Sequence, residues 1–255
     1  MQNITPKTLF TGQQVIYLPQ CGSTNSYAHE LLIKNSATDG CVVVTDCQTN
    51  GRGQRGNTWE AEPGKNLTLS YILKPHFLAA QHQFYLNICV SLAVVELVKV
   101  YLGSNYPKIT LKWPNDVYYG NYKIGGILIE NSLTGQFIQH SVIGIGLNIN
   151  QLSFLVAGAL SFSQITGKQY HLATIIERLS EQIEARYLQL QQGKFTKLKT
   201  DYLQCLYRYQ EEHLYVIAGK QVPGTIMGID DIGRLGLKTG HELQYFNFKE
   251  IAFVI

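Results

Sequence analysis

The sequence predicts an α+β protein: a mixed, largely antiparallel sheet with helices packed on it, followed by a small all-β barrel. Three observations support this. Turn residues at 119–121 and 134–135 join strand-like runs into successive hairpins. Segment 84–100 is apolar nearly all round, which is typical of a helix buried against a sheet. After about residue 210, short strand-like runs alternate with glycine-containing turns, which indicates the barrel.

Two kinds of pattern place the elements of the larger region. Alternating apolar residues or a short β-branched run predict a strand, and Pro114 ends one of these because it cannot donate to a ladder. An apolar stripe at helical spacing predicts a helix, and the polar triplet Ser23, Thr24 and Asn25 is suited to begin the first one. The expected strands lie at 15–18, 41–44, 67–73, 109–113, 124–130 and 137–149, and the expected helices at 26–34, 84–100, 172–190 and 196–206.

The change of pattern near residue 210 predicts two domains. Residues 1–208 form the larger domain and residues 209–255 the small β domain. No Pro/Ser-rich linker separates them, so we expect the two to pack directly against each other. The strands of the small domain are expected at 213–218, 225–229, 234–238 and 242–246.

Composition excludes several classes of protein. The 255 residues are 45% hydrophobic and 15% charged, enough for one substantial core and a small second domain, and not typical of a disordered or fibrous chain. The net charge is only +3 and no basic run forms a footprint for a phosphate backbone. We therefore expect no nucleic-acid partner.

Cysteine usage and apolar runs bear on the compartment. The five cysteines include no CxxC pair, which favours reduced thiols in a cytosolic protein over a zinc site or a disulfide framework. The first residues lack a basic region followed by an apolar core, and no apolar stretch reaches the roughly 18 residues of a membrane span. We expect a soluble, cytoplasmic protein with no membrane partner.

The segment GRGQRGNTW, residues 51–59, is the first candidate binding motif. Its glycines let the backbone approach a ligand closely, while Arg52 and Arg55 add permanent charge in a planar fork that matches phosphate or carboxylate. These features favour an anionic ligand. The segment is not a P-loop, and its GxGxxG pattern alone is weak evidence for a dinucleotide site. A mobile surface turn remains an alternative.

The segment KWPNDV, residues 112–117, places polar residues after a strand that ends at Trp-Pro. The amide of Asn115 is suited to a purine edge, the carboxylate of Asp116 to Mg²⁺, and Lys112 supplies a cation. Taken alone, a Pro-Asn-Asp turn explains these residues as well.

Two more segments combine glycines with a polar residue. KIGGILIE, residues 123–130, puts Lys123 just before paired glycines, where an ordinary solvated lysine is the alternative. GIGLNIN, residues 144–150, buries Asn148 in an apolar strand, where an unpartnered amide would cost about 1–3 kcal/mol. A structural amide bonded to backbone is the alternative for Asn148.

The order and joint occurrence of these motifs resemble biotin protein ligase over nearly the whole chain. The matching patterns are an STN triplet, GRGxRGxxW, KWPND, K(I/L)xGIL(I/V)E, GxGxN(I/V)N and a small β domain after them. The resemblance implies a class II synthetase-like catalytic domain with an SH3-like C-terminal domain. Only about 14 residues precede the first expected strand, so we expect the monofunctional type without an N-terminal DNA-binding domain.

The same resemblance implies the chemistry and the partners. Biotin protein ligases join biotin to ATP, with Mg²⁺, to make biotinyl-5′-adenylate and pyrophosphate. They then transfer biotin to one lysine of the biotin carboxyl carrier domain of acetyl-CoA carboxylase or a related carboxylase. The resemblance also allows a homodimer.

The residues that match the motifs take their expected roles from the resemblance. Catalysis is expected of Lys123, Arg52 and Arg55, whose charges would offset repulsion between the carboxylate of biotin and the α-phosphate. Biotin binding is expected of Ser23, Thr24, Asn25, Gln48, Gly51, Arg52, Gly53, Gln54, Lys123 and Gly126. ATP binding is expected of Arg55, Trp59, Lys112, Asn115, Asp116 and Asn148, with Asp116 also holding the metal.

One position departs from the family pattern. Many relatives read GRGRRG, whereas residue 54 is Gln54, so a cation often assigned to the adenylate phosphate is missing.

Three other functions are alternatives. A lipoate ligase would share the sheet and the carrier-lysine chemistry but lacks the pairing of GRGxRG with KWPND. A biotin-sensing repressor would need a DNA-binding module. A non-catalytic biotin-binding module would not need Lys112, Asp116 and Lys123.

Overall fold

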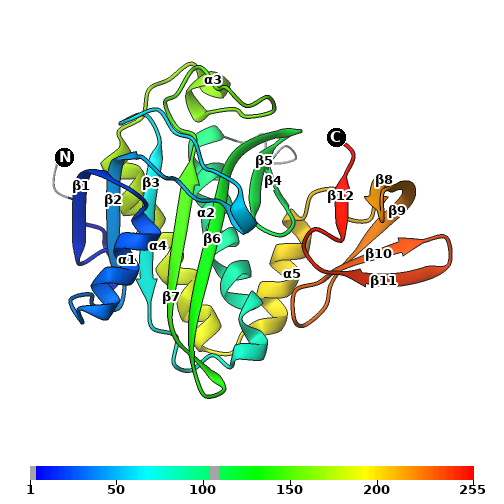
Figure 1. Ribbon diagram of the computed structural model, residues 1–255, viewed down its shortest axis with the longest axis horizontal. Coiled ribbons are helices and arrows are strands. Elements are labelled where there is room, and N and C mark those ends of the chain that lie inside the picture. Colours follow the sequence, from blue (N-terminus) through cyan, green and yellow to red (C-terminus); the bar gives the residue numbers. More distant parts are fainter. Residues whose placement is uncertain (1–3, 104–108) are drawn as a thin grey trace.

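The computed structural model describes residues 4–103 and 109–255, and within them the named strands form two sheets (Figure 1). The larger sheet has seven strands and the smaller one five. The strands of the larger sheet are β1 (Val15–Cys21), β2 (Cys41–Gln48), β3 (Leu67–Leu73), β4 (Ile109–Lys112), β5 (Asp116–Tyr119), β6 (Tyr122–Thr134) and β7 (Phe137–Leu147).

The larger sheet is mixed and mostly antiparallel, as the sequence predicted. Its spatial order is β1-β2-β3-β7-β6-β5-β4, and β1 pairs with β2 in parallel while every other neighbouring pair is antiparallel. Strand β5 was not expected, because its four residues lie directly between two turns. It forms a hairpin with β4, in which Lys112 lies opposite Asp116.

The register of the central strands leaves part of one sheet face bare. Gly146 of β7 lies opposite both Thr68 of β3 and Gly126 of β6. Two residues along, Gly144 lies opposite Ser70 and Leu128. Paired residues share a face, and alternate residues along a strand return to it. The middle of this face, called here the front face, therefore carries mainly glycines and small hydroxyl side chains, with Leu128 as the bulkier residue among those paired here.

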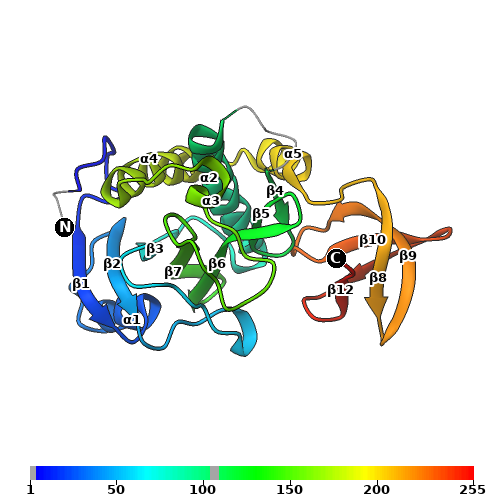
Figure 2. The same ribbon diagram turned by 90° about the horizontal axis from the view of Figure 1, so that it is seen from above.

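Helices cover the two faces of this sheet unequally. Figure 2 shows α2 (Phe84–Leu102), α4 (Leu172–Gln191) and α5 (Phe195–Cys205) together on the back face, with α1 (Thr24–Ile33) on the front face. The main core lies between the back face and these three helices, and a smaller apolar cluster lies under α1. The short elements are α3 (Phe162–Thr166) and the 3₁₀ turns η1 (Gln54–Gly56) and η2 (Ala80–His82).

The two apolar clusters explain strand β2. Val42 and Val44 contact the main core, whereas Cys41 and Val43 contact the cluster under α1. Strand β2 is therefore covered on both faces, which accounts for its unbroken apolar run at 41–44.

Helix α2 contradicts the expectation that no apolar stretch is long enough to span a membrane. The segment Ala80–Leu102 is long and apolar enough to cross a membrane, with a mean hydropathy of 1.7 over its best window, although none was expected to reach that length. However, 72% of that window is buried inside the protein. The helix packs against α4, α5 and the back of the sheet, which confirms its predicted position as a core helix.

The smaller sheet follows α5 and is antiparallel, with the order β11-β10-β9-β8-β12. Its strands are β8 (Glu212–Ile217), β9 (Lys220–Ile229), β10 (Leu235–Thr239), β11 (Glu242–Phe246) and β12 (Ile251–Phe253). It packs directly on the larger sheet, where Trp113 Nε1 donates to the carbonyl of Gly233 at 2.9 Å. Strand β12 was not expected, because three residues carry too little pattern; it pairs with β8 at the edge of the small sheet.

Candidate active site

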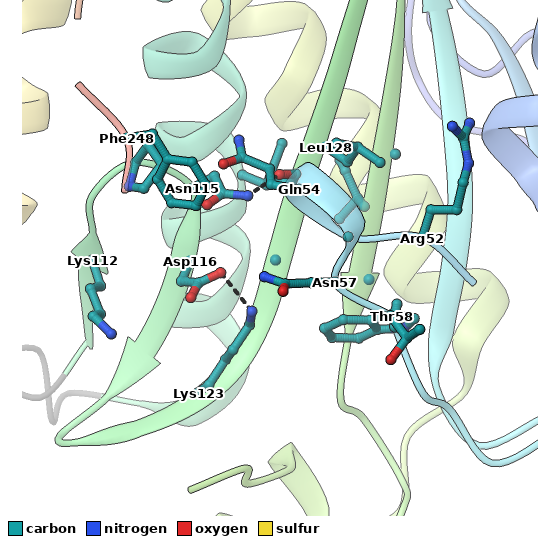
Figure 3. A pocket seen from close by; sticks show the side chains of 18 of the residues that line it. Arg52, Gln54, Asn57, Thr58, Lys112, Asn115, Asp116, Lys123, Leu128 and Phe248 are labelled. Carbon is teal, nitrogen blue, oxygen red and sulfur yellow. Dashed lines mark hydrogen bonds and ion pairs between the residues drawn. The ribbon is translucent and has the colours of Figure 1, made fainter. Parts of the chain in front are cut away.

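A cavity of about 440 Å³ lies over the bare part of the front face. Its floor includes Gly126, Gly144 and Gly146, and its walls come from the glycine loop (51–59), the β4–β5 hairpin and the segment 248–253 of the small sheet (Figure 3). The front-face glycines thus provide room that side chains would otherwise fill.

The glycine loop is folded by its own backbone bonds. Gly53 N donates to Asn57 O at 2.7 Å and Trp59 N donates to Gly51 O at 3.0 Å, with η1 at the tip. A Cβ at Gly51 would overlap the carbonyl oxygen of Trp59, so the close approach requires glycine. Gly56 has φ of 88°, which also favours glycine.

The ring of Trp59 lies directly on the backbone of Gly146. A Cβ at Gly146 would overlap the indole ring, so the two positions are matched in shape. The indole Nε1 is buried and has no hydrogen-bond partner among the described residues. The ammonium of Lys123 lies 5.8 Å from the centre of the ring. Trp59 therefore presents an aromatic surface beside a cation.

At one end of the cavity lie the uncharged polar side chains of Thr24, Asn25 and Gln48, which contact the buried Ser70; these four residues are called here the polar floor. Gln48 Oε1 accepts from the backbone N–H of Thr24 at 2.8 Å and lies 3.1 Å from the Thr24 hydroxyl. The hydroxyl of Ser70 lies 2.7 Å from Thr24 Oγ1 and 2.6 Å from Asn25 Oδ1. Ser23 is the N-cap residue of α1 but its side chain makes no capping bond, and Thr24 and Asn25 lie within the first turn. Thr24 and Asn25 thus serve the cavity more than the helix end.

Arg52 lies at the same end of the cavity as the polar floor. Its two terminal nitrogens donate to the two carboxylate oxygens of Glu130, each at 3.1 Å. In Figure 3 its side chain lies apart from Lys123 and Asp116. The structure therefore separates Arg52 from Lys123, although both were expected to compensate the same phosphate charge.

The other end of the cavity is cationic. Lys123 Nζ lies 2.6 Å from Asp116 Oδ1, and both are 3.5 Å from the position of a Cβ on Gly126. Lys112 is half-buried between the rings of Tyr118 and Phe253, each centred 5.1 Å from its ammonium. Burial lowers the pKa of Lys112, with the positive charge of Lys123 adding to this and Asp116 opposing it. Asp116 is the one carboxylate among the described residues lining the cavity.

The two asparagines expected at the nucleotide differ in position. Asn115 lines the cavity and donates through Nδ2 to the carbonyl of Ile127 at 2.5 Å. Asn148 is buried beside the cavity and does not line it, and its Nδ2 donates to the carbonyl of Leu160 at 3.2 Å. Its Oδ1 is buried and has no hydrogen-bond partner among the described residues.

The sequence model of the Biotin/lipoate A/B protein ligase family matches residues 17–148, which include both ends of this cavity. The chain belongs to this family. It is 32% identical over 238 residues to "Bifunctional ligase/repressor BirA" of Bacillus spizizenii, covering 91% of this chain and 72% of the relative. It is 30% identical over 230 residues to "Biotin--[acetyl-CoA-carboxylase] ligase" of Mycobacterium tuberculosis, covering 89% of this chain and 84% of the relative.

Solved structures share the fold of this family member. The biotin protein ligase from Aquifex aeolicus in complex with biotin and ATP superposes with a TM-score of 0.79 at 23% sequence identity. The match covers 94% of this chain and 98% of that one. The α+β class predicted from the sequence is therefore confirmed.

Most of the site residues predicted for this ligase-family chain lie together around one cavity. Those that line it are Thr24, Asn25, Gln48, Arg52, Gly53, Gln54, Trp59, Lys112, Asn115, Asp116, Lys123 and Gly126. Ser23, Gly51 and Asn148 lie next to lining residues but not on the cavity surface. The side chain of Arg55 lies outside the described residues. The roles of all these residues remain predictions.

Two contributors to the site were not predicted from the sequence. Glu130 closes the KIGGILIE motif and binds Arg52, but nothing in the motif indicates a partner 78 residues away. Phe248, Lys249, Ala252 and Phe253 line the cavity from the small sheet. No local pattern marks them, because only the packing of the two sheets brings them to the front face.

Proposed function

We propose that this chain is a biotin protein ligase. It forms biotinyl-5′-adenylate from biotin and ATP and transfers the biotin to a lysine of the biotin carboxyl carrier domain of acetyl-CoA carboxylase or a related carboxylase. The observation that carries the proposal is a single cavity with an uncharged polar floor at one end and a cationic cluster at the other. The activities named for the two relatives support the same function.

The polar floor suits the head group of biotin, a small neutral ring with donors and an acceptor. Thr24, Asn25 and Gln48 supply hydroxyl and amide groups, while Leu128 and the glycine backbone of β7 supply apolar contact. Apolar contact combined with a few placed polar groups is typical of small-molecule sites. With its head group at this floor, the carboxylate of biotin extends toward Lys123.

In the first reaction an oxygen of the biotin carboxylate attacks the α-phosphorus of ATP, and the bond to pyrophosphate breaks. Both reactants are anionic, so cations must offset the repulsion and the charge that grows on the phosphate oxygens. Lys123 and Lys112 lie at the cationic end, and Trp59 offers a flat surface for the adenine. No covalent enzyme intermediate is needed.

Asp116 fits a role in holding Mg²⁺ together with the phosphates of ATP. Mg²⁺ in nucleotide sites commonly uses one or two carboxylates plus phosphate oxygens and water, and Asp116 is the one described carboxylate on the cavity surface. Bound there, the ion would neutralise charge on the triphosphate. Asp116 also pairs with Lys123 and so holds its ammonium in place.

In the second reaction the neutral amine of the carrier lysine attacks the acyl carbon of the mixed anhydride, the bond to AMP breaks, and the amine gives up a proton. The main task of the protein is to position the anhydride and to exclude water. The glycine loop and the segment 248–253 wall the cavity for this purpose.

The proposal includes a cytoplasmic location. All five cysteines are free, and free cysteines are typical of a reducing compartment.

The test combines the purified protein with biotin, Mg-ATP and an isolated carrier domain, followed by mass spectrometry of the carrier. We expect one biotin on one lysine, and none when that lysine is replaced by arginine. A parallel reaction contains lipoate in place of biotin, and modification of the carrier in that reaction alone would indicate a lipoate ligase. Biotin binding with no pyrophosphate release and no modified carrier would indicate a binding module.

A further inference from the structure

Glu130, on the front face of β6, joins three elements of the site. Its carboxylate accepts hydrogen bonds from both terminal nitrogens of Arg52, each at 3.1 Å, and from Nδ2 of Asn25 at 2.7 Å. Nε2 of His29 lies 3.3 Å from the same carboxylate. Arg52 belongs to the glycine loop, whereas Asn25 and His29 belong to α1. One carboxylate thus connects the loop, the helix and the sheet.

The amide of Asn25 is held at both ends. Its Nδ2 donates to Glu130, and its Oδ1 accepts from the hydroxyl of Ser70 at 2.6 Å. A Cβ at Gly144 would overlap Oδ1, so the backbone of β7 also confines the amide. Because a flip would break both bonds, the group that Asn25 offers to a ligand depends on Glu130.

These contacts form a continuous path from the polar floor to the glycine loop. Thr24 Oγ1 lies 2.7 Å from Ser70 Oγ, and Ser70 in turn contacts Asn25. Asn25 contacts Glu130, and Glu130 contacts Arg52. Every step is a hydrogen bond or an ion pair, so a change at one end alters the restraint at the other.

We propose that Glu130 is a positioning residue that couples the polar floor to the glycine loop. It orients the Asn25 amide and holds Arg52 before a ligand is bound. A bidentate carboxylate–guanidinium pair fixes geometry as well as charge, and a loop that is already restrained loses less entropy on binding. The ligand that gains most is the one at the floor. If the proposed function holds, that ligand is biotin, and ATP gains less.

The test compares Glu130→Gln with Glu30→Gln as a matched control. Glu130→Gln keeps the size of the side chain and removes its charge. Glu30 lies on α1, and its 58% exposed side chain pairs only loosely with Lys34, at 3.8 Å. The first readout is trypsin cleavage after Arg52 or Arg55 in the ligand-free protein, with the cut sites identified by mass. This readout requires no enzymatic activity.

Glu130→Gln should speed cleavage in the loop by about 3- to 30-fold, the range for a partly exposed ion pair plus one hydrogen bond to a charged group. Trypsin should cleave the loop of Glu30→Gln at the wild-type rate. In the ligase assay, Glu130→Gln should raise the KM for biotin about tenfold and leave the KM for ATP within about twofold, because the floor lies away from the cationic end. Glu130→Asp, which keeps the charge, should restore part of the biotin affinity.

Two results would overturn the proposal. The first is that Glu130→Gln and Glu30→Gln show the same rate of loop cleavage and the same KM for biotin. The other is cleavage spread over both sheets with a lowered melting temperature, because Glu130 would then only hold the fold. If Glu130→Gln does not fold, Glu130→Asp answers the same question in both assays. Faster loop cleavage in a chain without ligase activity would reject the proposed function and retain the coupling.

Discussion

Replacing Lys123 with alanine separates the stability of the protein from its chemistry. The ammonium of Lys123 pairs with Asp116 at 2.6 Å, and the two side chains are 35% and 23% exposed. An ion pair this accessible to solvent contributes about 0–1 kcal/mol to the free energy of unfolding. For a chain of this size, that loss lowers the melting temperature by at most about 2–4 °C.

The expected effect on adenylation is much larger. Lys123 lies at the cationic end, where charge grows on the phosphate oxygens in the transition state. Removing one preorganised donor to such a charge costs about 2.7–4 kcal/mol, or about 10²- to 10³-fold in kcat. Because this greatly exceeds the expected loss of stability, a fall in rate cannot be assigned to unfolding.

The assay follows pyrophosphate release from biotin and Mg-ATP, with a thermal melt of the same samples. Lys197→Ala is the matched control, because Lys197 also pairs with an aspartate, Asp201, at 2.9 Å but lies on α5 away from the cavity. We expect normal adenylation in Lys197→Ala. Near-normal adenylate synthesis in Lys123→Ala would remove Lys123 from the mechanism.

Three further predictions concern other parts of the molecule. Gly146→Ala places a methyl group where the ring of Trp59 lies, so we expect a changed Trp59 fluorescence in a Trp113→Phe background and a raised KM for ATP; an unchanged emission would contradict the packing. Gln54→Arg restores a cation in the glycine loop and should slow escape of biotinyl-adenylate by about ten- to a hundredfold, which an unchanged off-rate would refute. Burial alone would raise the pKa of Asp201, but hydrogen bonds from Arg186 and Lys197 outweigh it and hold the pKa below its ordinary 3.8. Asp201 therefore stabilises the fold fully above pH 3.8, and this contribution is lost as pH falls through the lower folded pKa. Asp201→Asn should cost about 1–3 kcal/mol at neutral pH, with the difference closing in acid denaturation curves below that pH.

Local patterns identified most elements because their apolar spacing reflects what they pack against. Strand β3 and helix α2 follow this rule, and both were predicted within two residues of their observed bounds. Strands β5 and β12 have only four and three residues, too few to show a period. Their position depends on pairing with neighbours, which a single sequence does not reveal.

The site was predictable where chemistry and motif coincide and not where distant segments meet. Lys123 and Asp116 belong to separate motifs that the β5–β6 hairpin brings together, so their proximity could be anticipated. The contact of Lys112 with Phe253 depends on the packing of the second sheet, which no motif encodes. The Arg52–Glu130 pair likewise depends on how the glycine loop folds over β6.

Segment 248–253, which forms the last wall of the cavity, is synthesised long after the larger sheet. The larger sheet is complete by residue 147, but the last wall of its cavity is translated more than 100 residues later. A chain still attached to the ribosome can therefore fold its larger sheet while it lacks a closed cavity. Such a nascent chain, or one truncated before β8, would lack part of the wall that shelters a reactive anhydride from hydrolysis.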